Sequence, residues 1–170
     1  MTRLAFSHVA ITCQDPEAVE RFYGKHFGFK RARVYAPGPG QVVMLKAHGV
    51  YLELFPSTQP APVAPATGAG PEYAGWRHIA FLVDDLDAKL AQMGGDARVS
   101  LGPLDMSDLI PGMRVCWLAD PEGNIVELNQ GYRDQADLVA AAPAPAASRR
   151  AGANGKPLRR RGQTAGGGAA

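Results

Sequence analysis

Residues 6–12, Phe-Ser-His-Val-Ala-Ile-Thr, and residues 76–82, Trp-Arg-His-Ile-Ala-Phe-Leu, are two versions of one stretch. An offset of 70 positions carries His8 onto His78. Both versions show the alternation of apolar residues that is typical of a strand, and an aspartate that can start a helix follows each of them. The sequence therefore predicts an internal duplication, in which one small module occurs twice.

A second pair of matched stretches supports the duplication. Residues 49–54 read Gly-Val-Tyr-Leu-Glu-Leu, and residues 123–128 read Gly-Asn-Ile-Val-Glu-Leu. They place Glu53 in the first half and Glu127 in the second at corresponding positions. Each half thus carries one histidine and one glutamate, two residue types that bind metal ions.

Turn and cap signals divide each half into five elements. In the first half, a strand within 2–12 is followed by a helix that Asp15 caps and Gly28 ends. In the second half, Asp85 caps the corresponding helix. The remaining strands are expected at 30–35, 41–46, 50–55, 97–101, 113–119 and 125–129. The predicted fold class is α+β, with the order β-α-β-β-β found twice.

The domain boundaries follow from composition. The first module is expected to span 4–55 and the second 76–132, with a Pro/Ala/Gly-rich linker at 56–75. Residues 136–170 hold six basic residues and one acid, with many Ala, Gly and Pro residues, and are expected to form a disordered tail. The chain up to that point has a net charge of −3, so the slightly basic pI comes from the tail.

Length and composition fit one soluble domain or two fused modules. The chain has 170 residues, of which 46% are hydrophobic and 20% charged. No apolar run approaches the ~20 residues of a membrane span, so no membrane partner is expected. The two cysteines form no disulfide framework, and both are interpreted as buried small apolar residues in a cytoplasmic protein.

Strand periodicity places each of the four metal-capable residues on the sheet face that points away from the helix of its own half. In each half the apolar neighbours of the histidine and of the glutamate face the helix, so His8, Glu53, His78 and Glu127 point the other way. If the two sheets curve toward each other, two imidazoles and two carboxylates converge in one cleft. Such a set suits a divalent ion and leaves Ni, Zn, Co, Mn and Fe open.

Each of these residues also has an ordinary structural interpretation. A single strand histidine is most often structural, and a strand glutamate often faces solvent. Their duplicated placement favours a metal site over coincidence. His26 and His48 lack such support. His26 is expected at a helix surface or edge, and His48 in a hairpin turn. Six further residues are candidates for shaping a pocket, although core packing is the commoner role: Tyr51, Phe55, Trp76, Arg114, Trp117 and Asn129.

Residues 4–132 resemble the vicinal oxygen chelate superfamily, also known as the glyoxalase/bleomycin resistance/dioxygenase group. The resemblance rests on residues 7–10, 15–29 and 77–81, and most specifically on residues 120–128, Asp-Pro-Glu-Gly-Asn-Ile-Val-Glu-Leu. It implies two βαβββ modules that pair into a metal-containing cup. The cup forms within one chain in some members and between two chains in others.

The His/Glu/His/Glu pattern is similar to that of glyoxalase I and methylmalonyl-CoA epimerase. The resemblance implies that His8, Glu53, His78 and Glu127 are the metal ligands. It also implies a glyoxalase I-like (lactoylglutathione lyase-like) lyase or isomerase that acts by proton transfer next to a metal-bound carbonyl of a small molecule. Glu127 is the first candidate for the catalytic base and Glu53 the second.

Two other functions stay open for this fold. One is an Fe(II)-dependent ring-cleaving dioxygenase, and the other is a non-catalytic, resistance-type protein that binds a small molecule. A homodimer is expected as the assembly. Basic residues mixed with Gly and Ala in 136–170 more often increase solubility than recognise nucleic acid, so a nucleic-acid partner is not expected.

Overall fold

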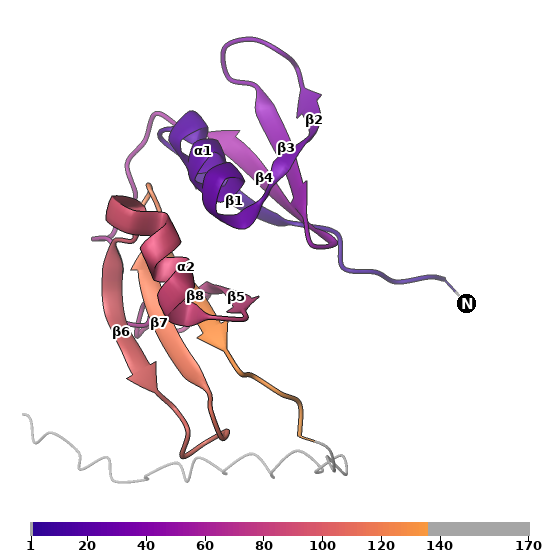
Figure 1. Ribbon diagram of the computed structural model, residues 1–170. Coiled ribbons are helices and arrows are strands. Elements are labelled where there is room, and N and C mark those ends of the chain that lie inside the picture. The colour runs from indigo at the N-terminus through magenta and orange to yellow at the C-terminus, as the bar shows by residue number, and fades with distance from the viewer. Residues whose placement is uncertain (1, 136–170) are drawn as a thin grey trace, which may run out of the picture. The chain divides into compact units, whose positions relative to one another are not determined.

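The predicted order of elements occurs twice in the computed structural model, which describes residues 2–135 (Figure 1). The first module contains β1 (Val9–Cys13), α1 (Pro16–Phe27), β2 (Lys30–Tyr35), β3 (Val42–Ala47) and β4 (Val50–Pro56). The second contains β5 (Ile79–Val83), α2 (Leu86–Met93), the short 3-10 turn η1 (Gly94–Asp96), β6 (Val99–Asp105), β7 (Arg114–Ala119) and β8 (Ile125–Gln130). The α+β class and the repeated βαβββ order are confirmed.

Local signals start and stop the helices as expected. The Asp15 carboxylate accepts a hydrogen bond from the backbone N–H of Ala18, and Gly28 ends α1 in the left-handed conformation with a φ of 72°. The Asp85 carboxylate caps α2 in the same way. Strand β1 starts later than the alternation from residue 2 suggested, because its pairing with β4 begins only at Val9.

Each module forms a four-stranded sheet in which the first strand of the module lies at one edge and its second strand at the other. The strand orders are β1-β4-β3-β2 and β5-β8-β7-β6, with β1 parallel to β4 and β5 parallel to β8. Helix α1 lies across one face of the first sheet (Figure 1). Leu52 and Leu54 of β4 are buried in the core with α1 residues such as Val19. The alternate residue Glu53 therefore points to the face that α1 does not cover.

One aromatic core joins the two modules. Phe27 at the end of α1 stacks on Phe81 of β5, with ring centroids 4.3 Å apart. His26 belongs to this junction and is only 5% exposed, so its expected place on the helix surface was wrong. Its Nε2 lies 2.9 Å from Asp96 Oδ2 of the second module, a partner that the helical period of the sequence does not reveal.

The linker at 56–75 contains no helix and contributes only Pro56 to a strand, but part of it packs on the second module. Ala66 and Ala69 contact a small cluster formed by Val115, Trp117 and Ile125. The linker therefore covers part of the second sheet as well as joining the modules. The predicted tail at 136–170 lies outside the described residues. Among residues 2–135, no helix is long and apolar enough to cross a membrane.

Candidate metal centre

The first predicted ligand pair forms on neighbouring strands. His8 immediately precedes β1, and Glu53 lies on β4, the strand paired with β1. The Nε2 atom of His8 is 3.2 Å from Oε2 of Glu53. The other imidazole nitrogen, Nδ1, is 2.9 Å from the Ser7 hydroxyl oxygen. The imidazole is thus held from its outer side while Nε2 faces the carboxylate.

The second pair repeats this arrangement. His78 immediately precedes β5, and Glu127 lies on β8 beside it. The Nε2 atom of His78 is 3.1 Å from Oε2 of Glu127, and the two side chains are 22% and 11% exposed. The Nδ1 atom of His78 is 2.9 Å from the carbonyl oxygen of Ala69 in the linker. Asn129 Nδ2 donates a hydrogen bond to the other carboxylate oxygen, Oε1 of Glu127, at 3.0 Å.

The contact with Ala69 fixes the chemistry of His78. A carbonyl oxygen only accepts hydrogen bonds, so the Nδ1 of His78 must carry a proton. In a neutral imidazole, Nε2 then has a lone pair directed at the Glu127 carboxylate, which is itself only an acceptor. Two acceptors at 3.1 Å need a cation or a proton between them. This donor set therefore fits a divalent ion, which imidazole nitrogen and carboxylate oxygen bind well.

The structure does not gather all four predicted ligands within one chain. Among residues 2–135, no group of three or more His, Cys, Asp or Glu side chains is placed to hold a metal ion. His8 and Glu53 form one pair in the first module, and His78 and Glu127 form another in the second. The described part of the chain therefore presents two matched His–Glu pairs, each a candidate half-site.

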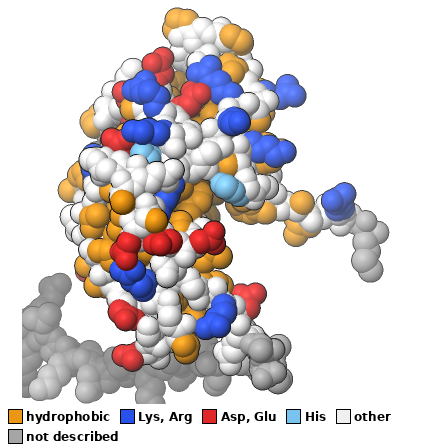
Figure 2. Space-filling model, in the orientation of Figure 1, with side chains coloured by type: hydrophobic (Ala, Val, Ile, Leu, Met, Phe, Trp, Pro, Cys, Tyr) orange, Lys and Arg blue, Asp and Glu red, His pale blue; other side chains and the backbone are white. Residues whose placement is uncertain are grey.

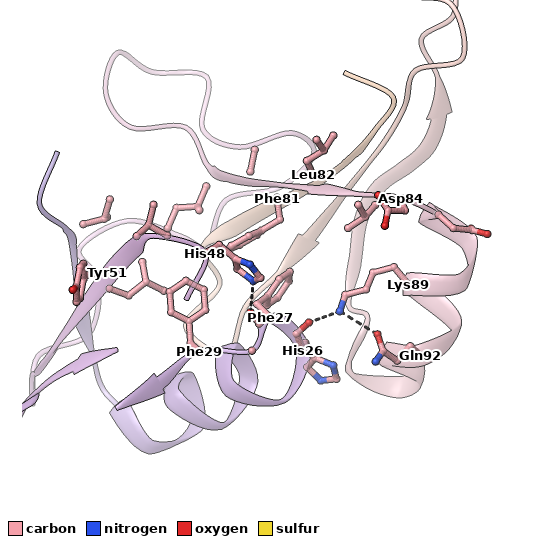
Figure 3. A pocket seen from close by; sticks show the side chains of 18 of the residues that line it. His26, Phe27, Phe29, His48, Tyr51, Phe81, Leu82, Asp84, Lys89 and Gln92 are labelled. Atoms are coloured by element: carbon pink, nitrogen blue, oxygen red, sulfur yellow. Dashed lines mark hydrogen bonds between the residues drawn. The ribbon is translucent and has the colours of Figure 1, made fainter. Parts of the chain in front are cut away.

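A groove of about 1010 Å³ lies between the two modules and contains none of the four predicted ligands (Figure 3). Phe27, Phe29 and Phe81 line it, together with residues of the edge strands β1 and β5. Its main cation is Lys89 of α2, which donates hydrogen bonds to the His26 carbonyl oxygen and to Gln92. Burial lowers the pKa of the Lys89 ammonium. The groove is thus an apolar surface distinct from both half-sites.

Two neighbours of the half-sites could not be assigned from the sequence. The Ala69 carbonyl orients His78, but a backbone atom of a linker leaves no residue signal apart from the glycines around it. Asn129 was a candidate for pocket shape, and the structure shows that it holds Glu127. Two other candidates for shaping a pocket have different surroundings. Arg114 forms an ion pair with Asp87 of α2, and Trp76 is 83% exposed to solvent.

Comparison with known proteins identifies the family. The model of the Glyoxalase/Bleomycin resistance protein/Dioxygenase superfamily matches residues 5–128. The chain belongs to this superfamily. Its members commonly bind a divalent metal, which agrees with the residue types in the two half-sites.

Individual relatives agree with this assignment. The chain is 33% identical over 124 residues to the uncharacterized protein YwkD of Bacillus subtilis (strain 168), a match that covers 71% of this chain and 92% of the relative. The crystal structure of a glyoxalase family protein from Enterococcus faecalis is 30% identical in sequence, with a TM-score of 0.56. This match covers 74% of this chain and 96% of that one. The protein in the crystal structure of SMU.1112c is 27% identical in sequence, with a TM-score of 0.55, and the match covers 75% of this chain and 99% of that one.

Proposed function

We propose that this superfamily member is a metal-dependent, glyoxalase I-like lyase or isomerase that moves a proton next to a carbonyl of a small molecule. The proposed site contains His8, Glu53, His78 and Glu127, with one His–Glu pair supplied by each of two chains. The observation that carries the proposal is the matched geometry of the two pairs, in which Nε2 faces Oε2 at 3.2 and 3.1 Å.

The edge strands support assembly from two chains. Neither β1 (Val9–Cys13) nor β5 (Ile79–Val83) contains a charged residue or proline, the features that usually protect a free edge from pairing. Apolar side chains beside these edges are exposed, including Phe6 at 71% and Leu82 at 67%. Each histidine directly precedes an edge strand. Pairing β1 of one chain with β5 of a second copy would thus bring the two half-sites together.

The same second copy is the proposed occupant of the groove between the modules. The groove is lined by Phe6 and Val9 from the first edge and by residues 79–83 from the second. It is therefore continuous with both strands that the second copy would pair with. Covering it would remove from water the exposed apolar side chains next to the edges, which favours association.

The residues of the chain suggest how the reaction would run. A divalent ion at this site would polarise the carbonyl and stabilise the negative charge that forms when the adjacent carbon loses a proton. Glu127 is proposed to take that proton through Oε2, because Asn129 engages its Oε1 and fixes the carboxylate. The same carboxyl group would then return the proton to the neighbouring carbon or to the opposite face of the first one, which leaves Glu127 ionised again. Glu53 is the second candidate for this role.

Mixing two inactive variants tests the shared site. His8→Ala and His78→Ala each damage every site of their own homodimer. A mixed dimer of the two, however, contains one site with all four ligands, formed by the intact first module of one chain and the intact second module of the other. Unfolding and refolding the variants together should restore about a quarter of the wild-type metal content. A site formed within one chain would show no recovery.

Solvent deuterium exchange tests the chemistry. The metal-loaded protein should introduce deuterium from heavy water next to the carbonyl of an α-hydroxy-carbonyl compound, a thiohemiacetal or a 2-substituted acyl thioester. The control is Glu127→Gln loaded with the same metal. No exchange with any of these classes would contradict the lyase or isomerase assignment. Oxygen consumption with a catechol would then indicate a dioxygenase, and tight binding without turnover a binding protein.

A further inference from the structure

The face of the first sheet that carries Glu53 has a second chemical feature, a row of cations. The register pairs Met44 with Glu53, and Arg33 of β2 with Met44. At the next position on the same face, two residues along β3 and β4, Lys46 pairs with Tyr51. Lys30 of β2 in turn pairs with Lys46. Residues that are paired across strands share a face. Lys30, Arg33 and Lys46 therefore lie on the same face of the sheet as the His8–Glu53 half-site.

This arrangement costs stability as it stands. Lys30 and Lys46 are direct cross-strand partners, and like charges placed opposite each other destabilise a sheet. In the part of the chain that the structure describes, none of the three cations forms an ion pair with an acidic side chain. By contrast, the neighbouring Arg31, which points to the helix side, forms a two-pronged pair with Glu20 at 2.6 and 2.8 Å.

Two tyrosines hold the cations on this face. The Lys46 ammonium lies 5.1 Å from the centre of the Tyr51 ring, and the Arg33 guanidinium lies 5.9 Å from that of Tyr35. Such contacts orient a cation without neutralising its charge. Lys46 and Arg33 consequently remain available to an anion. Lys and Arg side chains predominate over the first module in the view of Figure 2, whereas Asp and Glu predominate over the second.

The second module provides an internal comparison. At the positions that correspond by register, Trp117 pairs with Glu127 and Ala119 pairs with Ile125, so neutral residues replace Met44 and Lys46. Leu101, the partner of Trp117, replaces Arg33. Arg98 corresponds to Lys30, and its side chain donates a hydrogen bond to the Ala119 carbonyl oxygen. Trp117 and Ile125 instead form an apolar cluster, which Ala66 and Ala69 of the linker partly cover. The duplication has thus kept the His–Glu pair in both modules, but the first sheet carries three cations at these positions and the second carries one.

We propose that Lys30, Arg33 and Lys46 form a subsite for an anionic group, a carboxylate or a phosphate, of the substrate. This inference rests on the proposed function in assigning the ligand to the reaction at His8 and Glu53. Neighbouring strands lie about 4.8 Å apart, so Lys46 on β3 is roughly 10 Å from the edge strand that follows His8. The substrate class is accordingly a carbonyl compound with an anionic group about 10 Å from the reacting carbon and an apolar part that contacts the second module.

An anion titration of the metal-free protein tests this subsite separately from catalysis. Inorganic phosphate and succinate are added in parallel at low salt, and amide shifts are followed by NMR. Saturable shifts are expected on β2 and β3 around Lys30, Arg33 and Lys46. Lys46→Gln and Arg33→Gln should each weaken binding about two- to fivefold, as expected for exposed charge pairs. The preferred anion distinguishes a phosphate from a carboxylate ligand.

Arg21→Gln is the matched control, since it removes one exposed cation from α1 on the opposite side of the same sheet. It should leave anion binding unchanged. The proposal is overturned if neither anion gives saturable shifts on β2 and β3, or if Arg21→Gln weakens binding as much as Lys46→Gln does. Because the protein in this test carries no metal, a negative result leaves the proton-transfer proposal standing, and failure of the deuterium exchange leaves the subsite standing.

Discussion

Gly70 shows how a single residue without a side chain supports the candidate metal centre. Its φ is 121°, a conformation that favours glycine, and a Cβ atom built there would lie 2.5 Å from the carbonyl oxygen of Arg77. The preceding residue, Ala69, supplies the carbonyl that orients His78. The linker backbone can therefore take its observed path beside His78 only if position 70 has no side chain.

We expect Gly70→Ala to weaken metal binding without unfolding the protein. The added methyl group must displace the Arg77 backbone or the linker, at a cost of about 1–3 kcal/mol, and either shift moves the Ala69 carbonyl away from His78. Competition with a chelator measures the metal affinity. Gly68→Ala is the control, because Gly68 lies in the same linker with a φ of 60° but a Cβ there meets nothing within 4 Å. Equal effects of the two variants would contradict this role of Gly70.

The two glutamates should differ when each is changed to glutamine. Glu127→Gln keeps the shape and one oxygen ligand but removes the basicity, so turnover should fall by about 10²–10⁴-fold, more than the metal content falls. Glu53→Gln should reduce turnover less for a similar loss of metal. Turnover is measured as deuterium exchange per bound metal. The opposite order would assign the base to Glu53.

Both cysteines have the structural role that the sequence suggested. Cys13 and Cys116 are fully buried. Burial raises the pKa of the Cys13 thiol to about 12, and the nearby carboxylates of Glu122, Asp120 and Asp15 add to the effect. Since the thiolate is the reactive form, Cys13 is chemically inert at neutral pH.

At the scale of elements, the turn between β7 and β8 fastens the second module to α1. The Tyr23 hydroxyl donates a hydrogen bond to Asp120 Oδ2 at 3.2 Å, and the backbone N–H of Asp15 donates one to Glu122 Oε1 at 2.8 Å. Both Tyr23 and Asp120 are fully buried. The residues of the turn, 120–124, are the same ones that carried the family resemblance, so part of that motif has a structural role in joining the modules.

We expect Tyr23→Phe to destabilise the protein by about 1 kcal/mol, because it removes one hydrogen bond from a buried carboxylate. Burial raises the pKa of Asp120, and the hydrogen bond from Tyr23 opposes that rise. A raised pKa means that the contribution of Asp120 to stability is complete below about pH 3.8 and is lost as the pH rises through the folded-state value. The variant should therefore lose more stability at about pH 8 than at about pH 4.5.

Urea unfolding at the two pH values measures this effect. Tyr73→Phe is the control, because Tyr73 is 64% exposed and should tolerate the change. A loss of stability in Tyr23→Phe that does not depend on pH would show that the ionised form of Asp120 is not what the hydroxyl stabilises.

At the scale of the whole molecule, the duplicated modules have become unequal. The first sheet presents cations beside its His–Glu pair, while the second presents an apolar cluster that the linker partly covers. An assembly of two chains would place one face of each kind at every site. The repeat thus explains the matched His–Glu pairs, and the differences between the repeats account for the proposed preference for a substrate that is apolar at one end and anionic at the other.

We expect residues 136–170 to be dispensable for folding and metal binding. The family model ends at residue 128, and the segment combines six basic residues with an Ala-, Gly- and Pro-rich composition that can bury little apolar surface. Deleting it should change the melting temperature by less than about 2 °C. Thermal unfolding and elemental analysis measure the two quantities, and a large fall in either would show that the segment contributes to the domain.

The sequence alone determined what depends on local periodicity. Alternation along β1, β4, β5 and β8 placed each histidine and each glutamate on the face away from a helix, and capping residues such as Asp15 and Gly28 set the helix ends. The repeat then placed one histidine and one glutamate in each half, His8 with Glu53 and His78 with Glu127. These features follow from interactions between residues that are close in sequence or related by the duplication, so they can be predicted without tertiary information.

Only the tertiary structure decided how the two modules are joined and how the predicted ligands are held. It separated the four predicted ligands into two His–Glu pairs within residues 2–135, placed the Ala69 carbonyl on His78 and buried His26 against Asp96. Each of these outcomes depends on packing between segments far apart in the sequence, in which a backbone atom or the fit of aromatic rings such as Phe27 and Phe81 decides the geometry. Hydrophobic periodicity carries no information about such contacts, because many arrangements of two modules bury the same apolar faces.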